Sequence, residues 1–120
     1  MMPAKTDQWV DAVAKLTELT QDGKLEWNAQ SFTDNESVIG PTYHATYGDK
    51  RLRLQKRGAM VKKKAWAEEE WTEQYVLEFV DGNDKTLWAF PQIDAIQHLY
   101  GAVQYQTAGV KDFLDDLLKQ

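Results

Sequence analysis

The sequence contains no cysteine at any of its 120 positions. This absence excludes disulfide bonds, thiolate nucleophiles, cysteine-ligated zinc and iron–sulfur clusters. No apolar run approaches the roughly eighteen residues that a membrane-spanning helix needs, so we expect no membrane association. The seven glycines are isolated and form no phosphate-binding or dinucleotide motif. We therefore expect no cofactor and no bound metal.

The beginning of the chain lacks the apolar segment of a secretion signal, because Asp7 and Asp11 follow closely on Lys5. A cytoplasmic location is the expectation that follows. The length favours a single domain over residues 1–120. With 42% hydrophobic and 28% charged residues, the composition is typical of a globular protein in water.

Three segments have the periodicity of amphipathic helices. The first spans residues 6–22, with Thr6 or Asp7 as its N-cap and Gly23 as its end. The second begins at Pro91, and a third follows Gly109 as far as Leu118.

Alternating apolar residues predict two strands, 42–47 and 51–57, joined by a two-residue turn at Gly48-Asp49. This turn sets Ala45 opposite Leu52 and Tyr43 opposite Leu54, so that the apolar faces coincide. A one-residue slip would destroy that agreement.

A third strand at 74–80 places Leu77 opposite Leu54, Phe79 opposite Leu52, and Glu78 opposite Arg53. After a turn at 81–84, a fourth strand at 86–90 is expected to pair Trp88 with Leu77 and Phe90 with Tyr75. Residues 25–27 form a fifth strand or lead into one.

These elements predict an α+β fold. An antiparallel four- to five-stranded meander sheet carries the N-terminal helix and the two C-terminal helices on one face. The expected core comprises Tyr43, Leu52, Leu54, Leu77, Phe79, Trp88 and Phe90 from the sheet, and Trp9, Val13, Leu16, Ile96, Leu99, Val103 and Phe113 from the helices.

The segment 58–71 allows two interpretations. As a projecting β-arm it would pair Lys62–Lys64 with Glu68–Glu70 around Trp66, and a β-bulge at Gly58 would be needed to fit the neighbouring register. As a short helix it would place Lys64 and Glu68 one turn apart.

Aromatic residues are concentrated in this segment. Trp66 and Trp71, together with Met60, lie where the meander extends beyond its expected core. Exposed tryptophans among mixed charges favour a protein interface. They could equally fold back on Met60 as a separate apolar cluster.

Eight basic residues and no acidic ones occur between positions 50 and 64. They are Lys50, Arg51, Arg53, Lys56, Arg57, Lys62, Lys63 and Lys64. Such a run can bind phosphate groups, and nearby tryptophans can stack on bases. The alternative is a solvated strand face whose charge is balanced by acidic residues on the next strand. The net charge of −5 argues against a dedicated nucleic-acid binder.

Few residues suggest catalysis. His44, Arg53 and Glu78 form a row across the outer sheet face that could act as base, anion clamp and orienting carboxylate. A ladder of exposed polar residues would give the same row. His98 and Asp94 are one helical turn apart, which is more typical of a surface pair than of a metal site.

The sequence resembles a loose group of small uncharacterised bacterial α+β domains. The resemblance rests on the segment Gly23-Lys24-Leu25-Glu26-Trp27, on residues 75–83, on Leu99-Tyr100 and on residues 114–118. The segment 58–71 is longer than in that pattern. The resemblance implies the same order of helices and strands and no catalytic residue.

Our leading hypothesis from the sequence is a non-enzymatic protein-interaction module. It would bind a protein partner or a second copy of itself through the 58–71 arm, giving a homo-oligomer in the latter case. Nucleic-acid binding through residues 50–64 is the alternative, and an enzyme using His44, Arg53 and Glu78 is the third hypothesis.

Overall fold

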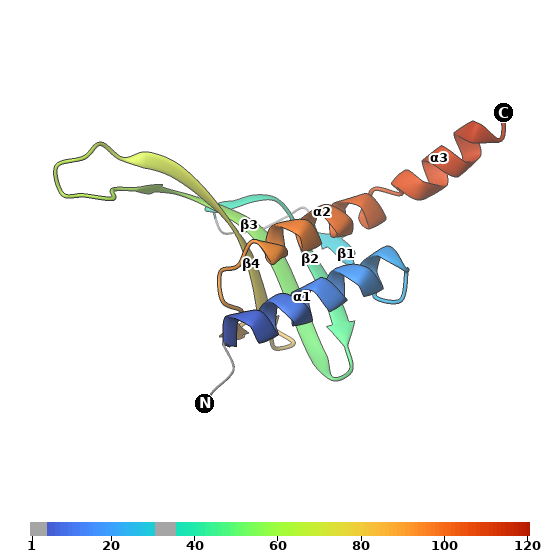
Figure 1. Ribbon diagram of the computed structural model, residues 1–120, viewed down its shortest axis with the longest axis horizontal. Coiled ribbons are helices and arrows are strands. Elements are labelled where there is room, and N and C mark those ends of the chain that lie inside the picture. The colour runs from blue at the N-terminus through green and yellow to red at the C-terminus, as the bar shows by residue number, and fades with distance from the viewer. Residues whose placement is uncertain (1–4, 31–35) are drawn as a thin grey trace.

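The computed structural model describes residues 5–30 and 36–120, and the side chains from residue 8 onward within the first range. It confirms the α+β fold: an N-terminal helix, a five-stranded antiparallel sheet and two C-terminal helices (Figure 1). The N-cap predicted at Thr6 or Asp7 lies outside the described side chains.

Helix α1 (Lys5–Gln21) ends where the sequence predicts. Gly23 adopts the left-handed conformation with φ of 73°, and the Lys24 N–H donates to the Leu19 carbonyl at 2.9 Å. Only glycine adopts this conformation without a steric penalty, which explains its position at the helix end.

The sheet is a meander in which each strand pairs with the next one along the chain. Its strands are β1 (Asn28–Gln30), β2 (Val38–Tyr47), β3 (Lys50–Val61), β4 (Glu70–Val80) and β5 (Thr86–Ala89).

The predicted pairing of the three central strands is confirmed. Tyr43 lies opposite Leu54, which in turn lies opposite Leu77. Ala45 pairs with Leu52, and Leu52 with Phe79. The alternating pattern therefore fixes which face of these strands is apolar.

The predicted register of the last strand is wrong by two residues, because Trp88 lies opposite Phe79 rather than Leu77. One residue of this register difference arises in the turn. There Asp84 has a φ of 64°, and the Asp81 N–H donates to the Lys85 carbonyl. The other comes from a register shift between Phe79 and Val80. Since a shift of two residues keeps the same face, Trp88 still packs against the Trp9 and Phe90 rings.

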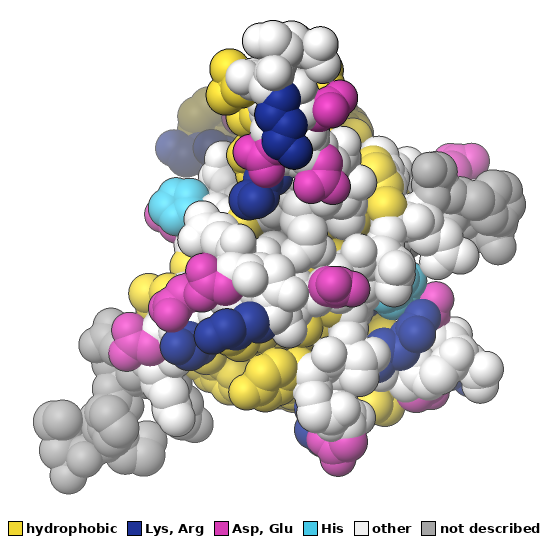
Figure 2. Space-filling model, turned by 90° about the vertical axis from the view of Figure 1, so that its right-hand side faces the viewer, with side chains coloured by type: hydrophobic (Ala, Val, Ile, Leu, Met, Phe, Trp, Pro, Cys, Tyr) yellow, Lys and Arg dark blue, Asp and Glu magenta, His cyan; other side chains and the backbone are white. Residues whose placement is uncertain are grey.

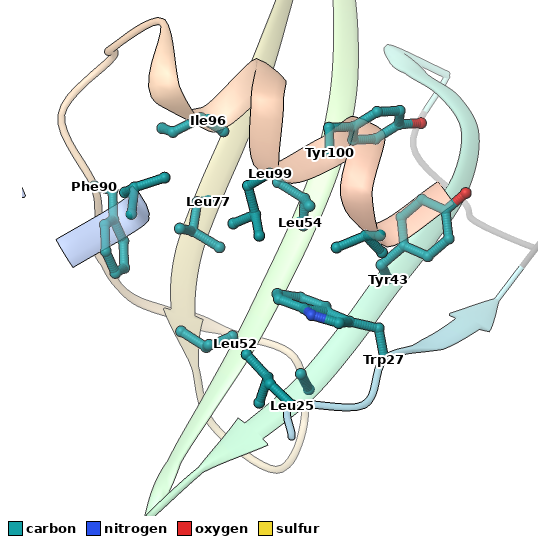
Figure 3. Close-up of a cluster of buried hydrophobic side chains, with 13 residues drawn as sticks. Leu25, Trp27, Tyr43, Leu52, Leu54, Leu77, Phe90, Ile96, Leu99 and Tyr100 are labelled. Atoms are coloured by element: carbon teal, nitrogen blue, oxygen red, sulfur yellow. The ribbon is translucent and has the colours of Figure 1, made fainter. Parts of the chain in front are cut away.

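Helix α2 (Ala95–Thr107) packs over the sheet beside α1 and closes the core. In Figure 3 its inward side chains meet those of β3 and β4, with Trp27 at the side of the cluster. The fully buried members are Val13, Leu54, Leu77, Ile96, Leu99 and Val103.

Helix α3 (Val110–Leu118) differs from the prediction because it buries none of its residues. Phe113, expected in the core, is 64% exposed. Gly109, with φ of 70°, separates α3 from α2, and α3 projects past the end of α2 (Figure 1). Periodicity identifies an apolar face but not the surface that it meets.

Gln106 joins α2 to the end of α1 and to the segment that leads into β1. Its Oε1 accepts the Trp27 N–H at 2.8 Å, while its Nε2 donates to the Thr20 and Leu25 carbonyls at 3.0 and 2.9 Å. The Trp27 indole N–H donates to the Thr20 hydroxyl at 3.0 Å. Gln106 thereby bonds the Leu25 carbonyl and the Trp27 N–H just after α1, and it gives the Thr20 carbonyl a second donor besides the Gly23 N–H.

The molecule is elongated, with extents of 59 × 40 × 29 Å. Its radius of gyration is 16.5 Å, against about 14 Å for a compact chain of this length. The accessible surface is 8599 Å², whereas a compact monomer of this mass exposes about 6,600 Å². The two projecting features in Figure 1 are α3 and the outer half of the β3–β4 hairpin.

Candidate functional site

The segment 58–71 is the outer half of a long β-hairpin, hereafter the arm, and the helical alternative is wrong. Strands β3 and β4 stay in one register from Arg51–Val80 to Val61–Glu70, so there is no bulge at Gly58. The predicted Lys–Glu pairs at the tip are consequently displaced. Lys63 approaches Glu70 at 3.9 Å, and the turn is closed by the Ala67 N–H and the Lys64 carbonyl.

Gly58 has another role, which is to make room for Trp71. A Cβ at position 58 would lie 2.5 Å from Trp71 Cη2, closer still to Cζ2, and 2.9 Å from Ile39 Cδ1. The indole therefore lies across the glycine on the neighbouring strand, an arrangement that shields the strand backbone. The sequence predicted a β-bulge at this glycine, because a bulge and a close approach by a neighbouring group both favour a residue without a side chain.

The polar edge of Trp71 is also fixed. Its Nε1 donates to Glu73 Oε2 at 2.9 Å, and Lys56 Nζ lies 3.1 Å from Glu73 Oε1. The hydrogen bond from Trp71, followed by that from Lys56, lowers the pKa of Glu73. Trp71 is thus held in place on the arm and is not free to rotate.

The interface residues predicted from the sequence are exposed together on the arm. Trp66 is 81% exposed at the tip, while Met60 and Trp71 are opposite one another on β3 and β4 and are each more than half exposed. Val61 is exposed beside them. Monomeric proteins seldom leave such a group of large apolar side chains in water.

Five of the eight basic residues at 50–64 form ion pairs within the chain. Arg51 pairs with Asp84, Lys56 with Glu73, and Lys63 with Glu70, while Arg53 and Arg57 both pair with Glu78. Lys50 lies over the Phe79 ring at 5.9 Å. Of these eight residues, Lys62 and Lys64 have neither a carboxylate partner among the described residues nor a place on the sheet face.

Glu78 is the centre of a polar network on the sheet face away from the helices. Its Oε1 accepts from Arg53 Nη2 at 2.7 Å and Arg57 Nη2 at 3.1 Å, and its Oε2 accepts from the Thr86 hydroxyl at 2.9 Å. Arg57 also donates to Gln55 Oε1. The carboxylate is 6% exposed, so the network is a buried structural element and not a solvated ladder.

His44 lies in the predicted row but is not oriented by Glu78. Its Nε2 lies 3.1 Å from Asp84 Oδ1, at an angle that makes no hydrogen bond, and Asp84 also pairs with Arg51. Burial lowers the pKa of His44, the Asp84 charge opposes this shift, and the Arg51 charge adds to it. Arg53 stands between the two groups, because it donates to Glu78 Oε1 and to the Asp84 carbonyl, while the carboxylate beside His44 is that of Asp84 and not that of Glu78.

The other candidates are surface features. His98 and Asp94 are exposed on and before α2, with no ion pair between them. Across residues 5–30 and 36–120, no three His, Asp or Glu side chains come together in a way that could hold a metal ion.

The sequence interpretation missed a second exposed apolar surface. Phe113, Leu114, Leu117 and Leu118 are all exposed on α3, and together they are called the α3 apolar face. Figure 2 looks at the molecule from the end where α3 projects, and hydrophobic side chains lie at its surface beside charged ones. The amphipathic pattern indicated this face, but it was assigned to the core.

Comparisons with protein-family models, with curated proteins and with solved structures give no match to this chain. Among the described helices, none combines the length and the apolar character that crossing a membrane requires. Functional inference therefore rests on the geometry of the arm, the α3 apolar face and the polar networks.

Proposed function

We propose that this protein is a non-enzymatic protein-interaction module that self-associates through the arm. The observation that carries the proposal is the exposure of Trp66, Trp71 and Met60 on a paired hairpin that extends beyond the core. Tryptophan is the residue most enriched at interface positions where truncation weakens binding by about 2 kcal/mol or more. The held indole of Trp71 supports the proposal, since an already ordered side chain loses little entropy on binding.

Burial of charge supports an interaction role over a catalytic one. The Glu78 carboxylate accepts four hydrogen bonds from Arg53, Arg57 and Thr86, and His44 lies beside Asp84 instead. These networks stiffen the sheet from which the arm extends.

The test is the molar mass in solution, measured by size-exclusion chromatography with light scattering over a range of concentrations. We expect the intact chain to form a dimer or larger species. Trp66→Ser removes an 81% exposed side chain and should weaken association by roughly 30-fold, which corresponds to about 2 kcal/mol. Leu87→Ser removes another exposed apolar side chain, on β5, and serves as the matched control.

A second variant removes the arm without disturbing the inner sheet. Because Ala59 lies opposite Thr72, replacing residues 60–71 by Asn-Gly joins the strands through a two-residue turn in the native register. This variant should be monomeric and folded. An intact chain that is monomeric at every concentration, or a shortened chain that still associates, contradicts the proposal.

Nucleic-acid binding is the second candidate, favoured by one observation at the tip of the arm. Lys64 Nζ lies 5.0 Å from the centre of the Trp66 ring, and Lys62 is unpaired nearby. With Lys62 and Lys64 available, a labelled single strand should bind with a slope of about −1.4 in a plot of log affinity against log salt concentration. A titration at two salt concentrations that shows no binding, or no salt dependence, excludes this function.

A further inference from the structure

An apolar groove of about 290 Å³ lies between α1 and the sheet, where the helix crosses the strands near the turn of the β2–β3 hairpin (Figure 1). It shares no residue with the arm, with the α3 apolar face or with the Glu78 network. Its apolar walls include Trp9, Ala12, Leu16 and Leu19 from the helix, and Phe79 and Phe90 from the sheet side. A concave site with mostly apolar walls and few polar groups is the usual form of a small-molecule site.

The shape of the groove favours a long and unbranched ligand. Residues of α1 line the groove from Trp9 to Leu19, and about ten residues of α-helix extend about 15 Å. An apolar cavity of about 150 Å³ holds one benzene ring, so a volume of 290 Å³ has about twice the room that six carbons need. A single alkyl chain of roughly ten carbons therefore fits between the helix and the sheet.

The walls of the groove are held in place by the core behind them. Phe90 packs against the Trp9 and Phe79 rings, with ring centroids 5.1 and 5.2 Å apart. Leu16 and Leu19 pack against the buried core but are themselves only partly buried. An alkyl chain in the groove covers apolar surface that water now contacts, and it does so with little reordering of the protein.

The charged side chains that line the groove are basic. Lys15 and Lys50 contribute to its lining, whereas no Asp or Glu of the described residues does. Lys15 is paired with the exposed Glu18 at 3.3 Å, so its charge is already compensated. Lys50 has no carboxylate within 4 Å in the described chain, and its Nζ lies 5.9 Å from the centre of the Phe79 ring in the groove wall. Asp49, its neighbour in the turn, does not line the groove. An uncompensated cation at an otherwise apolar groove selects an anionic group on an apolar chain.

We propose that this groove binds a free alkyl carboxylate of medium length, with its chain between α1 and the sheet and its carboxylate at Lys50. The ligand is a single dissolved molecule and not a membrane surface, because the groove is walled by the helix on one side and by the sheet on the other. The inference goes beyond the proposed function. It concerns a different surface from the arm, so either can fail while the other holds.

Isothermal titration calorimetry of the full chain with sodium hexanoate, octanoate and decanoate tests the length of the site, with each ligand below the concentration at which it forms micelles. A fully buried methylene strengthens binding about fourfold, so decanoate should bind roughly tenfold more tightly than octanoate. Decyltrimethylammonium has the same chain with the opposite charge, and it should bind more weakly than decanoate.

Lys50→Glu tests the selection of the head group, because Lys50 is exposed and its replacement leaves the apolar walls unchanged. Decanoate should bind to this variant about tenfold more weakly than to the wild type, and decyltrimethylammonium should now be the tighter ligand. Lys62→Glu makes the same change in net charge on the arm. It serves as the matched control and should bind decanoate as the wild type does.

Ala12→Leu tests the location of the chain, because it places a larger side chain in the groove from α1. It should weaken decanoate binding by about tenfold or more. Ala14→Leu adds the same side chain at an exposed position of the same helix and should bind normally. Trp66→Ser should also bind normally, which distinguishes the groove from the exposed tip of the arm.

Every other result overturns the inference. The absence of binding by decanoate at millimolar concentration shows that the groove does not take such a chain. Equal affinity for the two head groups in the wild type, or in Lys50→Glu, shows that Lys50 does not select the ligand and leaves the groove to a neutral apolar partner. Loss of binding in Trp66→Ser places the chain on the arm. Circular dichroism checks that each variant is folded, and the Lys50→Glu result decides the matter if Ala12→Leu is not.

Discussion

The indole of Trp71 lies directly against the backbone of Gly58 on the neighbouring strand, in a space that no side chain at position 58 could share. This contact packs one large side chain of the arm across the neighbouring strand, in addition to the β3–β4 pairing that continues to Val61 and Glu70. It also decides what the arm presents, because the indole leaves one face packed and the other exposed.

Gly58→Ala should therefore displace Trp71 and destabilise the protein by about 1–3 kcal/mol, the usual cost of overpacking. Urea denaturation followed by far-UV circular dichroism measures the change. Gly82→Ala is the control, since a Cβ there meets nothing within 4 Å and its backbone is unstrained. Equal stability of the two variants would show that the indole moves aside freely.

Alanine substitutions at two other glycines should change the free energy of unfolding in opposite directions. Gly101 lies in the middle of α2 with open space around it, so Gly101→Ala should stabilise the protein by about 0.5–1 kcal/mol. Gly48 has φ of 63° in the β2–β3 turn, and Gly48→Ala should cost about 1–2 kcal/mol. Thermal unfolding of both variants beside the wild type gives the comparison. A loss of stability in Gly101→Ala would contradict the helix assignment.

The pairing of the central strands could be predicted because the residues that determine it lie close together in the sequence. Alternation along β2 and β3, together with the tight turn at Gly48, leaves only one register in which Tyr43, Leu54 and Leu77 share a face. The end of α1 at Gly23 could be predicted for the same reason, since the motif needs only the residues next to it.

The remaining features depend on side chains distant in sequence or on backbone angles that composition does not reveal. The β5 register was missed because Asp84 takes a left-handed conformation without being glycine. Gly58 was misread because its neighbour Trp71 belongs to another strand. Phe113 was assigned to the core because an amphipathic helix shows the same pattern whether its partner is its own chain or another molecule. The row of His44, Arg53 and Glu78 was placed correctly, but the ion pairs that its members form depend also on Arg57 and Asp84.

Glu78→Gln should be strongly destabilising, because Arg53 and Arg57 would keep their charges in a largely buried site without a carboxylate. Removal of one partner from a buried ion pair typically costs about 3 kcal/mol or more. Glu70→Gln breaks the exposed pair with Lys63 and should change stability by no more than about 0.5 kcal/mol. Chemical denaturation of both variants checks this contrast, and similar losses in the two would mean that burial of Glu78 is unimportant.

Stability should fall as the solution is acidified through the ordinary histidine value of 6.5. Burial lowers the pKa of His44 in the folded state, so below 6.5 the unfolded chain binds a proton that the folded chain does not. The loss is complete once the pH is below the lowered folded pKa.

Unfolding free energies of the wild type and His44→Gln over this range measure the effect, with exposed His98→Gln as the control. The His44→Gln profile should be flatter, and the His98→Gln profile should follow the wild type. Asp84 should contribute to the pH dependence of stability in a separate, more acidic range, below its ordinary pKa of 3.8. Burial alone would raise its pKa, but the Arg51 hydrogen bond and the nearby His44, Arg51 and Arg53 charges together lower it. A His44→Gln profile as steep as that of the wild type would contradict the assignment.

The hydrogen bonds of Gln106 have a kinetic consequence. The sheet is a meander of neighbouring hairpins, so most of its pairing can form early with short loop closures. Gln106, by contrast, joins residues 79, 81 and 86 positions away, at Trp27, Leu25 and Thr20. These bonds should form after the barrier has been crossed. Gln106→Ala should then accelerate unfolding and leave the refolding rate almost unchanged in stopped-flow measurements. The lifetime of the native state would thus be set where α2 meets the end of α1.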